Sequence, residues 1–289
     1  MDVNFIFKVR TDLQYLQKKM AKVIRDPAIG ELYKIKELCA EKGVDADIQK
    51  RLSDAITLAE ARDAYCASVS SEPSDALATL QRETLEYPFD QVYKDGKTKW
   101  KLNPRMMSGH FEGKFLQSIV SMSKAKRVLE IGMFTGYAAL ACAEALPEDG
   151  TVTTLEFDPF LEEVAKGFFA KSPCGKKISI RIGDAKETLL KLAEEKAQYD
   201  VVFIDANKDG YLNYFKTVIE KDLLAKGGTV VFDNALMYGG AYNMKSTNEH
   251  ALDIRKCNEY VKSRDDMFQV LVPIRDGALI VRRKEDVFL

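Results

Sequence analysis

The chain has 289 residues, of which 46% are hydrophobic, and its 43 Lys and Arg residues nearly balance its 44 Asp and Glu residues. That apolar content can fill a sizeable core, while a net charge of -1 provides no electrostatic attraction for nucleic acid or an anionic membrane. No apolar run reaches the roughly 18 residues of a membrane helix, and Val3–Phe7 is too short for a signal peptide, so we expect a cytoplasmic protein. The five scattered cysteines lack zinc-like spacing, so we expect them to be free thiols.

Residues 1–75 are predicted to form a helical N-terminal extension. Apolar residues recur at steps of three and four in two runs, Leu13–Val23 and Ile48–Ala59, which is typical of amphipathic helices. Ser68–Asp75 is polar and contains a helix start, so we expect a linker there and a further helix over residues 76–86. Residues 76–289 are then predicted to form the main domain.

From about residue 111, short apolar strands alternate with amphipathic helices. The expected strands are Arg127–Ile131, Val152–Phe157, Ile178–Ile182, Asp200–Ile204, Thr229–Phe232, Gln269–Pro273 and Leu279–Arg282. Nearly continuous apolar strands fit a parallel sheet covered on both faces, and the alternation predicts a doubly wound, Rossmann-like α/β domain. Arg275-Asp276-Gly277 is too short to make a parallel crossover, so the last strand of this seven-stranded sheet should be antiparallel.

A glycine-containing loop follows the first predicted strand and opens the next helix. In Glu130-Ile-Gly-Met-Phe-Thr-Gly136, Gly132 permits a tight turn beside a ligand and Gly136 permits close packing of the helix. Glu156 ends the next strand, where an acidic side chain can accept hydrogen bonds from two ribose hydroxyls. Taken singly, these residues are equally well explained as turn glycines and a solvated carboxylate. Together they predict a site for an adenosine-containing ligand.

The spacing within this loop separates two classes of cofactor. A dinucleotide fold requires G-x-G-x-x-G, whereas the bulky Phe134 stands here at the second glycine position. Glu130 would repel a phosphate, but it can accept a hydrogen bond from an ammonium group. The loop therefore favours S-adenosylmethionine, with a nicotinamide-dependent dehydrogenase as the alternative enzyme class.

Polar side chains also follow the fourth and fifth predicted strands. Asp205 comes directly after one strand, and Asp233 and Asn234 come directly after the other. Parallel strands end at the same edge of a sheet, so these side chains can converge. Two carboxylates and an amide oxygen suit Mg²⁺ and leave positions open for water and substrate. The structural alternative for a single aspartate is a helix N-cap.

Four motifs resemble one family, the cation-dependent O-methyltransferases that include the caffeoyl-CoA and catechol enzymes. They are LEIGMFTGY, ALPEDG, FIDANKDGYLNYF and FDNALMYGG, and they occur in the family's order within residues 103–284. The resemblance implies a class I methyltransferase fold. It also implies Asp205, Asp233 and Asn234 as metal ligands and Lys208 as the general base, so that Lys208 and Asp205 are the predicted catalytic residues. The cofactor contacts that it implies are Ser108, Glu130, Gly132, Met133, Ala138, Glu156, Asp184, Ala185 and Asn207.

Two of these positions depart from the family pattern. Asn207 stands where many members have a second aspartate, and Ala138 stands where a serine is usual. We expect both departures to affect contacts to the cofactor and to leave the chemistry in place.

A closer resemblance concerns the acceptor. The segments MMSGHFEGKFL, AKRVLEIGMFTGY, SPCGKKI and LVPIRDG are similar to the O-methyltransferases that help make 4-deoxygadusol, the mycosporine core. This subgroup implies an acceptor with vicinal oxygens, and a catechol or caffeoyl-CoA-type phenol is the alternative.

We expect a small-molecule acceptor and no nucleic-acid or membrane partner. We also expect a homodimer, and an extension that covers the acceptor side of the site or joins two copies, because its apolar helix faces need a partner. An inactive cofactor-binding scaffold is the alternative outside the enzymes.

Overall fold

The computed structural model describes residues 26–288, so the predicted helix over Leu13–Val23 lies outside the described residues. The chain divides into two compact units, residues 1–62 and 63–289, and each is described by itself. All five cysteines are free thiols. None of the described helices has the length and hydropathy needed to cross a membrane.

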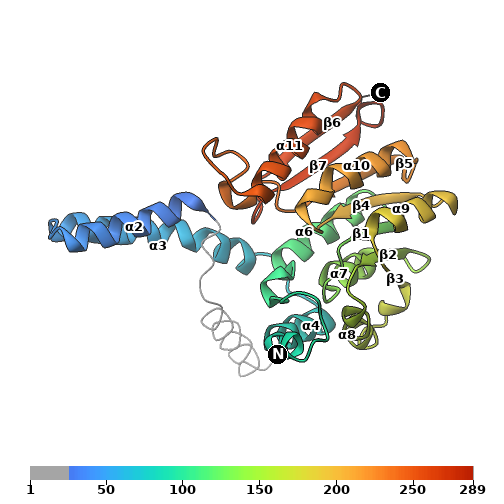
Figure 1. The fold of residues 1–289 in the computed structure, drawn as a ribbon, viewed down its shortest axis with the longest axis horizontal. Helices are drawn as coiled ribbons and strands as arrows, with labels where there is room; N and C mark the ends of the chain where they lie inside the picture. Colours follow the sequence, from blue (N-terminus) through green and yellow to red (C-terminus); the bar gives the residue numbers. More distant parts are fainter. Residues whose placement is uncertain (1–25, 289) are drawn as a thin grey trace. The chain divides into compact units, whose positions relative to one another are not determined.

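The described part of the first unit is a pair of antiparallel helices, α2 (Pro27–Glu41) and α3 (Ala46–Ser68), which continues past the unit's end (Figure 1). Asp26 caps α2 by accepting a hydrogen bond from Ala28 N at 2.9 Å, and proline at the first position suits a helix start. Gly43 supplies the left-handed residue of the turn, with φ +62°. The helical prediction for residues 26–68 is therefore confirmed.

The second unit contains the α/β part of the described structure. Its α-helices are α4 (Asp75–Glu86), α5 (Phe89–Lys94), α6 (Gly109–Met122), α7 (Tyr137–Ala145), α8 (Pro159–Phe169), α9 (Ala185–Glu194), α10 (Tyr211–Glu220) and α11 (Glu249–Ser263). Its strands are β1 (Arg127–Ile131), β2 (Thr151–Glu156), β3 (Ile178–Ile182), β4 (Tyr199–Ile204), β5 (Leu224–Phe232), β6 (Met267–Val272) and β7 (Ala278–Arg283). Single 3-10 turns η1 to η5 cover Pro104–Met106, Gly175–Lys177, Lys208–Gly210, Met237–Gly239 and Lys284–Asp286.

The seven strands form one sheet in the order β3-β2-β1-β4-β5-β7-β6. β1 to β5 pair in parallel, while β7 runs antiparallel to both β5 and β6. The predicted doubly wound sheet with an antiparallel last strand is confirmed. Because the order reverses beside β1, the crevice beyond the ends of β1 and β4 is where such sheets bind ligands.

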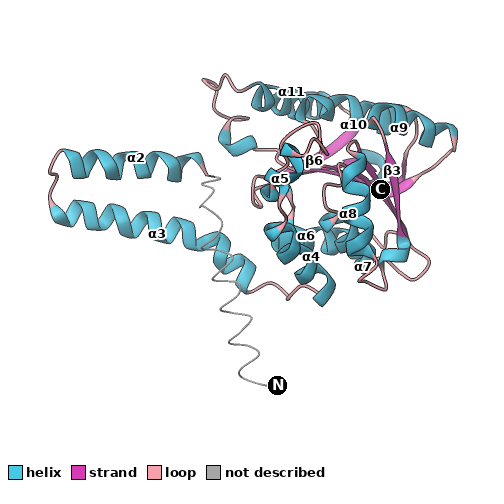
Figure 2. Ribbon diagram, turned by 60° about the horizontal axis from the view of Figure 1, so that its bottom comes forward, coloured by secondary structure: helices cyan, strands magenta, loops and turns pink. Residues whose placement is uncertain are grey.

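Helices cover both faces of the sheet (Figure 2). One buried cluster joins α4, α6, α7 and α8 to the side of β1 that carries Val128. The other joins α9, α10 and α11 to the side that carries Leu129 and Ile131. The two clusters arise because successive side chains of a strand point to opposite faces of the sheet. Their close packing holds the carboxyl ends of the parallel strands in one rigid edge.

β5 differs most from the prediction, because it starts at Leu224 and not at Thr229. Gly227 and Gly228 look like a turn in the sequence, and Gly227 has φ +77°. In the structure they belong to an irregularity at which the pairing of β4 with β5 shifts register. Glycine within a strand often marks such a bulge.

Candidate active site

The ends of β1, β4 and β5 are tied together at the carboxyl edge of the sheet. Asp205 N donates to Ile131 O at 2.9 Å, and Asp233 N donates to Ile204 O at 3.0 Å. Gly132 has φ +100°, and a Cβ there would collide with the carbonyl oxygen of Asp205. Only glycine allows this approach, which is the close turn predicted at Gly132. Because β4 and β5 are neighbours in the sheet, Asp205 and Asp233 stand at neighbouring strand ends.

Lys208 contacts Asp205 at this edge. Its Nζ donates to Asp205 Oδ1 at 3.0 Å and to the Tyr211 hydroxyl at 2.7 Å. The side chains of Lys208 and Asp205 are 14% and 17% exposed. Burial raises the pKa of Asp205, as does the neighbouring Asp233 carboxylate, while Lys208 acts in the opposite direction. The proposed base and its partner are therefore held together in a largely dry site.

Glu112, in the first turn of α6, brings a further carboxyl group to this place. It is 4% exposed, and its Oε2 lies 2.9 Å from Nη1 of Arg275. Its carboxyl group and that of Asp233 are within hydrogen-bond reach when one of them holds a proton. Burial, followed by repulsion from Asp233, raises the pKa of Glu112 well above its usual range, against the opposing effect of Arg275.

The predicted metal ligands have the donor chemistry that a hard divalent cation requires. Asp233 is 7% exposed, and its carboxylate lies within hydrogen-bond reach of Glu112. Asn234 adopts φ +54°, a conformation that asparagine tolerates better than most residues. No described group of three or more His, Cys, Asp or Glu side chains is arranged to hold a metal ion. Two carboxylates with one amide oxygen fit Mg²⁺ on chemical grounds.

The predicted cofactor side is built on β1 and β2. Glu130 is 2% exposed and accepts a hydrogen bond from Thr154 Oγ1. Burial raises the pKa of Glu130 to about 8. Glu156 accepts from Phe134 N and Asp158 N, both at 2.9 Å, which fixes its carboxylate at the end of β2. Burial also raises the pKa of Glu156, although these backbone hydrogen bonds act against it.

The remaining predicted cofactor residues divide by exposure. Ser108, Met133 and Ala138 are buried, at the start of α6, in the loop after β1 and in the first turn of α7 respectively. Asp184 and Asn207 are exposed, and Ala185 is half-buried. Asp184 caps α9 by accepting from Lys186 N at 2.7 Å, and the Asn207 side chain is bonded to Asp209 and Tyr214. These bonds show a local structural role for both residues, and their cofactor contacts stay a prediction.

Comparison with known proteins identifies the family. Residues 68–284 match the family model described as O-methyltransferase. The chain is 32% identical to caffeoyl-CoA O-methyltransferase 5 of Nicotiana tabacum over 225 residues, which is 73% of this chain and 92% of that protein. It is also 32% identical to caffeoyl-CoA O-methyltransferase of Petroselinum crispum, over 73% of this chain and 91% of that protein.

The chain belongs to the O-methyltransferase family. Among solved structures, it is similar to the SAH-bound Podospora anserina methyltransferase PaMTH1, with a TM-score of 0.68 and 26% identity over 79% of this chain and 96% of that one. The family resemblance predicted from the motifs is thus confirmed, and with it an S-adenosylmethionine-dependent O-methyltransferase. This excludes the nicotinamide-dependent alternative.

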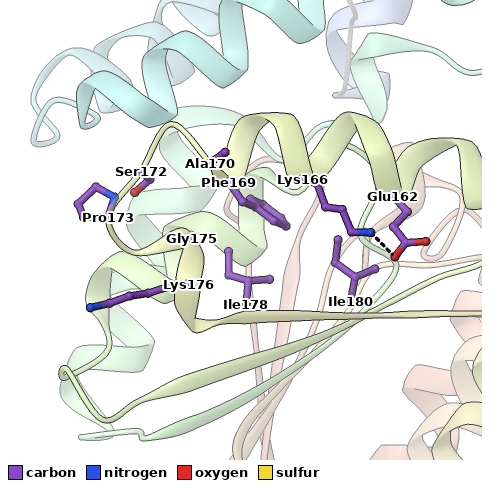
Figure 3. A pocket seen from close by; sticks show the side chains of 10 residues that line it. All are labelled: Glu162, Lys166, Phe169, Ala170, Ser172, Pro173, Gly175, Lys176, Ile178 and Ile180. Carbon is purple, nitrogen blue, oxygen red and sulfur yellow. Dashed lines mark ion pairs between the residues drawn. The ribbon is translucent and has the colours of Figure 1, made fainter.

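A second feature of this O-methyltransferase lies away from the predicted site. A cavity of about 540 Å³ is lined by residues of α8, the turn η2 and the edge strand β3 (Figure 3). Lys166 and Glu162 form an ion pair of 2.9 Å on its wall, and Ile178 and Ile180 form its floor. It contains none of the predicted catalytic, cofactor or metal residues. This cavity is therefore separate from the predicted site at the strand ends.

Sequence reasoning missed Glu112, although one feature of this O-methyltransferase's sequence points to it. Glu112 shares a buried helical stripe with Leu116, Ile119 and Val120, at steps of three and four residues. A carboxylate within an apolar stripe is rarely left without a partner. Its position in the buried stripe was therefore visible in the sequence, whereas its partner, Arg275, was not.

Proposed function

We propose that this protein transfers a methyl group from S-adenosylmethionine to a hydroxyl of a small acceptor that carries two adjacent oxygens. A divalent cation, Mg²⁺, would be held by Asp205, Asp233 and Asn234. One observation carries the proposal: the buried pair of Lys208 and Asp205 stands at the same sheet edge as Asp233 and the carboxylates of Glu130 and Glu156.

The residues of the site have separate roles in this proposal. The cation, when bound, would lower the pKa of the acceptor hydroxyl. Neutral Lys208 accepts the hydroxyl proton at Nζ. The Tyr211 hydroxyl can accept from Nζ or donate to it, so Lys208 keeps its position in both protonation states.

The methyl transfer itself exchanges one bond for another. An O–CH₃ bond forms as the S–CH₃ bond breaks, which leaves S-adenosylhomocysteine. The chain contributes orientation to this step, because Glu130 and Glu156 are fixed at the ends of β1 and β2, beside the loop that carries Lys208.

Two acceptor classes follow from the resemblances. The subgroup motifs favour the 4-deoxygadusol precursor of the mycosporines. The relatives named caffeoyl-CoA O-methyltransferase favour a phenolic acceptor. Both classes offer the adjacent oxygens that the proposed cation site requires.

A turnover screen tests the proposal. The full chain is incubated with methyl-labelled S-adenosylmethionine and, in turn, a catechol, caffeoyl-CoA and demethyl-4-deoxygadusol, with Mg²⁺ or with excess chelator. We expect labelled product with at least one acceptor, loss of turnover in chelator and recovery on adding Mg²⁺. Full turnover in chelator, with no metal found by elemental analysis, would remove the cation from the proposal. Cofactor binding without turnover of any acceptor would favour the inactive scaffold.

A further inference from the structure

Arg275 is a largely buried cation whose position the proposed chemistry does not explain. It lies in the turn between β6 and β7, and its side chain is only 16% exposed. Its Nη1 lies 2.9 Å from Glu112 Oε2, and a Cβ on Gly109 would lie 3.6 Å from the same nitrogen. The guanidinium therefore lies against the start of α6, beside Gly109 and the carboxylate of Glu112.

The backbone holds Arg275 in a conformation that arginine rarely adopts. Its φ is +50°, in the left-handed region where a side chain is strained. The turn is held there because Asp276 Oδ1 accepts from Tyr238 N at 2.7 Å and Asp276 O accepts from Leu236 N at 2.9 Å. Both donors follow Asn234 closely in the chain. The turn that carries Arg275 is thus bonded to the loop of the proposed metal ligands.

The guanidinium has more donors than the described structure uses. An arginine offers five N–H groups in a planar fork. Within residues 26–288, its one ion pair is the contact of Nη1 with Glu112. Polar groups in such dry surroundings are normally hydrogen-bonded, and the fork matches a carboxylate or two neighbouring anionic oxygens. The unused donors therefore point to a ligand oxygen that arrives with the substrate.

We propose that Arg275 binds an anionic oxygen of the acceptor, a carboxylate or an enolate, and that Glu112 is a positioning residue that orients the guanidinium. The inference rests on the proposed function, because it places the reacting hydroxyl at Lys208. Arg275 then determines which acceptor the enzyme prefers. A negatively charged group on the acceptor accepts hydrogen bonds from the guanidinium, whereas a neutral acceptor of the same size leaves those N–H groups without an acceptor.

Two probes of nearly equal size test this role. They are 3,4-dihydroxybenzoate, which carries a carboxylate, and 3,4-dihydroxybenzyl alcohol, which is neutral. Calorimetry on the full chain with S-adenosylhomocysteine and Mg²⁺ measures the affinity of each. We expect at least about tenfold tighter binding of the carboxylate, a ratio that falls to about one in Arg275→Met.

Three further variants make the result specific. Arg181→Met removes an exposed arginine that pairs with Glu195 at the sheet edge, and it should keep the parent ratio. Arg275→Met with Glu112→Gln removes both charges, so the loss can be measured even if the single variant does not fold. Glu112→Gln alone should lower the ratio of the two affinities, whereas a merely structural role would weaken both probes equally.

The outcomes separate this inference from the proposed function. Equal affinities in the parent protein, no binding of either probe, or a ratio that survives in both Arg275 variants would overturn the role of Arg275. Mg²⁺-dependent turnover of a neutral acceptor in the parent, together with equal probe affinities, would leave the methyltransferase proposal standing and overturn the inference alone.

Discussion

Glu130 is predicted to bind the ammonium group of the cofactor, and this contact would couple cofactor binding to pH. Its pKa of about 8 in the free protein means that it is mostly protonated at pH 7. To make its predicted contact with the ammonium group of the cofactor, the carboxyl group must ionise, so we expect binding to release a proton. We expect the affinity for S-adenosylhomocysteine, which has the same amino acid end, to rise by up to about tenfold from pH 6 to pH 7. Calorimetry in buffers of different ionisation enthalpy measures both the affinity and the proton.

Glu130→Gln is the control for this pH dependence. Because the pKa in the folded state lies above the ordinary value of 4.5, the folded protein binds more protons between pH 4.5 and about 8. The contribution of Glu130 to the free energy of unfolding therefore falls as the pH rises across that window. The variant should lose this contribution and bind the cofactor with little dependence on pH. An equal rise in the variant and the parent would assign the proton to another group.

Glu156 has a structural role as well as its predicted contact to the ribose. Glu156→Ala leaves the amides of Phe134 and Asp158 without their acceptor, which costs about 1–3 kcal/mol for each amide that stays dry. We expect a lower Tm and weaker binding of S-adenosylmethionine, with metal affinity close to that of the parent. Calorimetry with each ligand separates the two effects. Unchanged cofactor affinity would refute the assignment of Glu156.

Lys208 is tested by removing its ability to accept a proton while keeping its charge. Lys208→Arg can keep the ion pair with Asp205, but arginine does not deprotonate in proteins. We expect Lys208→Met and Lys208→Arg both to lower kcat by about 10²–10⁴-fold, with partial recovery at higher pH in Lys208→Met. Cofactor binding is measured alongside. Near-parent activity in Lys208→Arg would show that only the charge matters.

At the scale of elements, Gly132 sets how closely β1 and β4 end beside each other. In Gly132→Ala, the new Cβ would collide with Asp205 O in a backbone conformation of φ +100°. We expect a loss of several kcal/mol of unfolding free energy and loss of cofactor binding. Gly167→Ala, in α8, is the matched control, because nothing beyond its chain neighbours and its own helix backbone lies within 4 Å of its Cβ position. That variant should be neutral or stabilised by about 0.5–1 kcal/mol in denaturant titrations.

The elements were largely predictable because their patterns are local. β1 and β3, whose apolar residues are bounded by polar segments, begin and end where the sequence predicts. The start of β5 was missed because a glycine pair resembles a turn unless the neighbouring strand is known. The pair of Glu112 and Arg275 was missed for a related reason. Its two residues are far apart in the sequence and meet only when α6 packs beside the β6–β7 turn.

At the scale of the whole molecule, deletion of the N-terminal extension tests what the first unit contributes. Both buried clusters of the second unit lie between Leu77 and Val281. We therefore expect a chain lacking residues 1–68 to fold, with a Tm near that of the parent. If the extension covers the acceptor or joins two protomers, the truncated chain should show a changed acceptor KM or a smaller mass in light scattering. Parent-like kinetics and parent-like mass would make the extension an independent appendage.

The place of β7 between β5 and β6 has a consequence for biosynthesis. β6 is made before β7, yet its only strand partner in the described sheet is β7, and β7 is also the strand that covers the edge of β5. While the ribosome is still adding residues up to 278, the five parallel strands can assemble, but β5 presents an open edge and β6 has nothing to pair with. The sheet is completed only by the insertion of one late strand, so the nascent protein depends on protection of that edge until synthesis has passed β7.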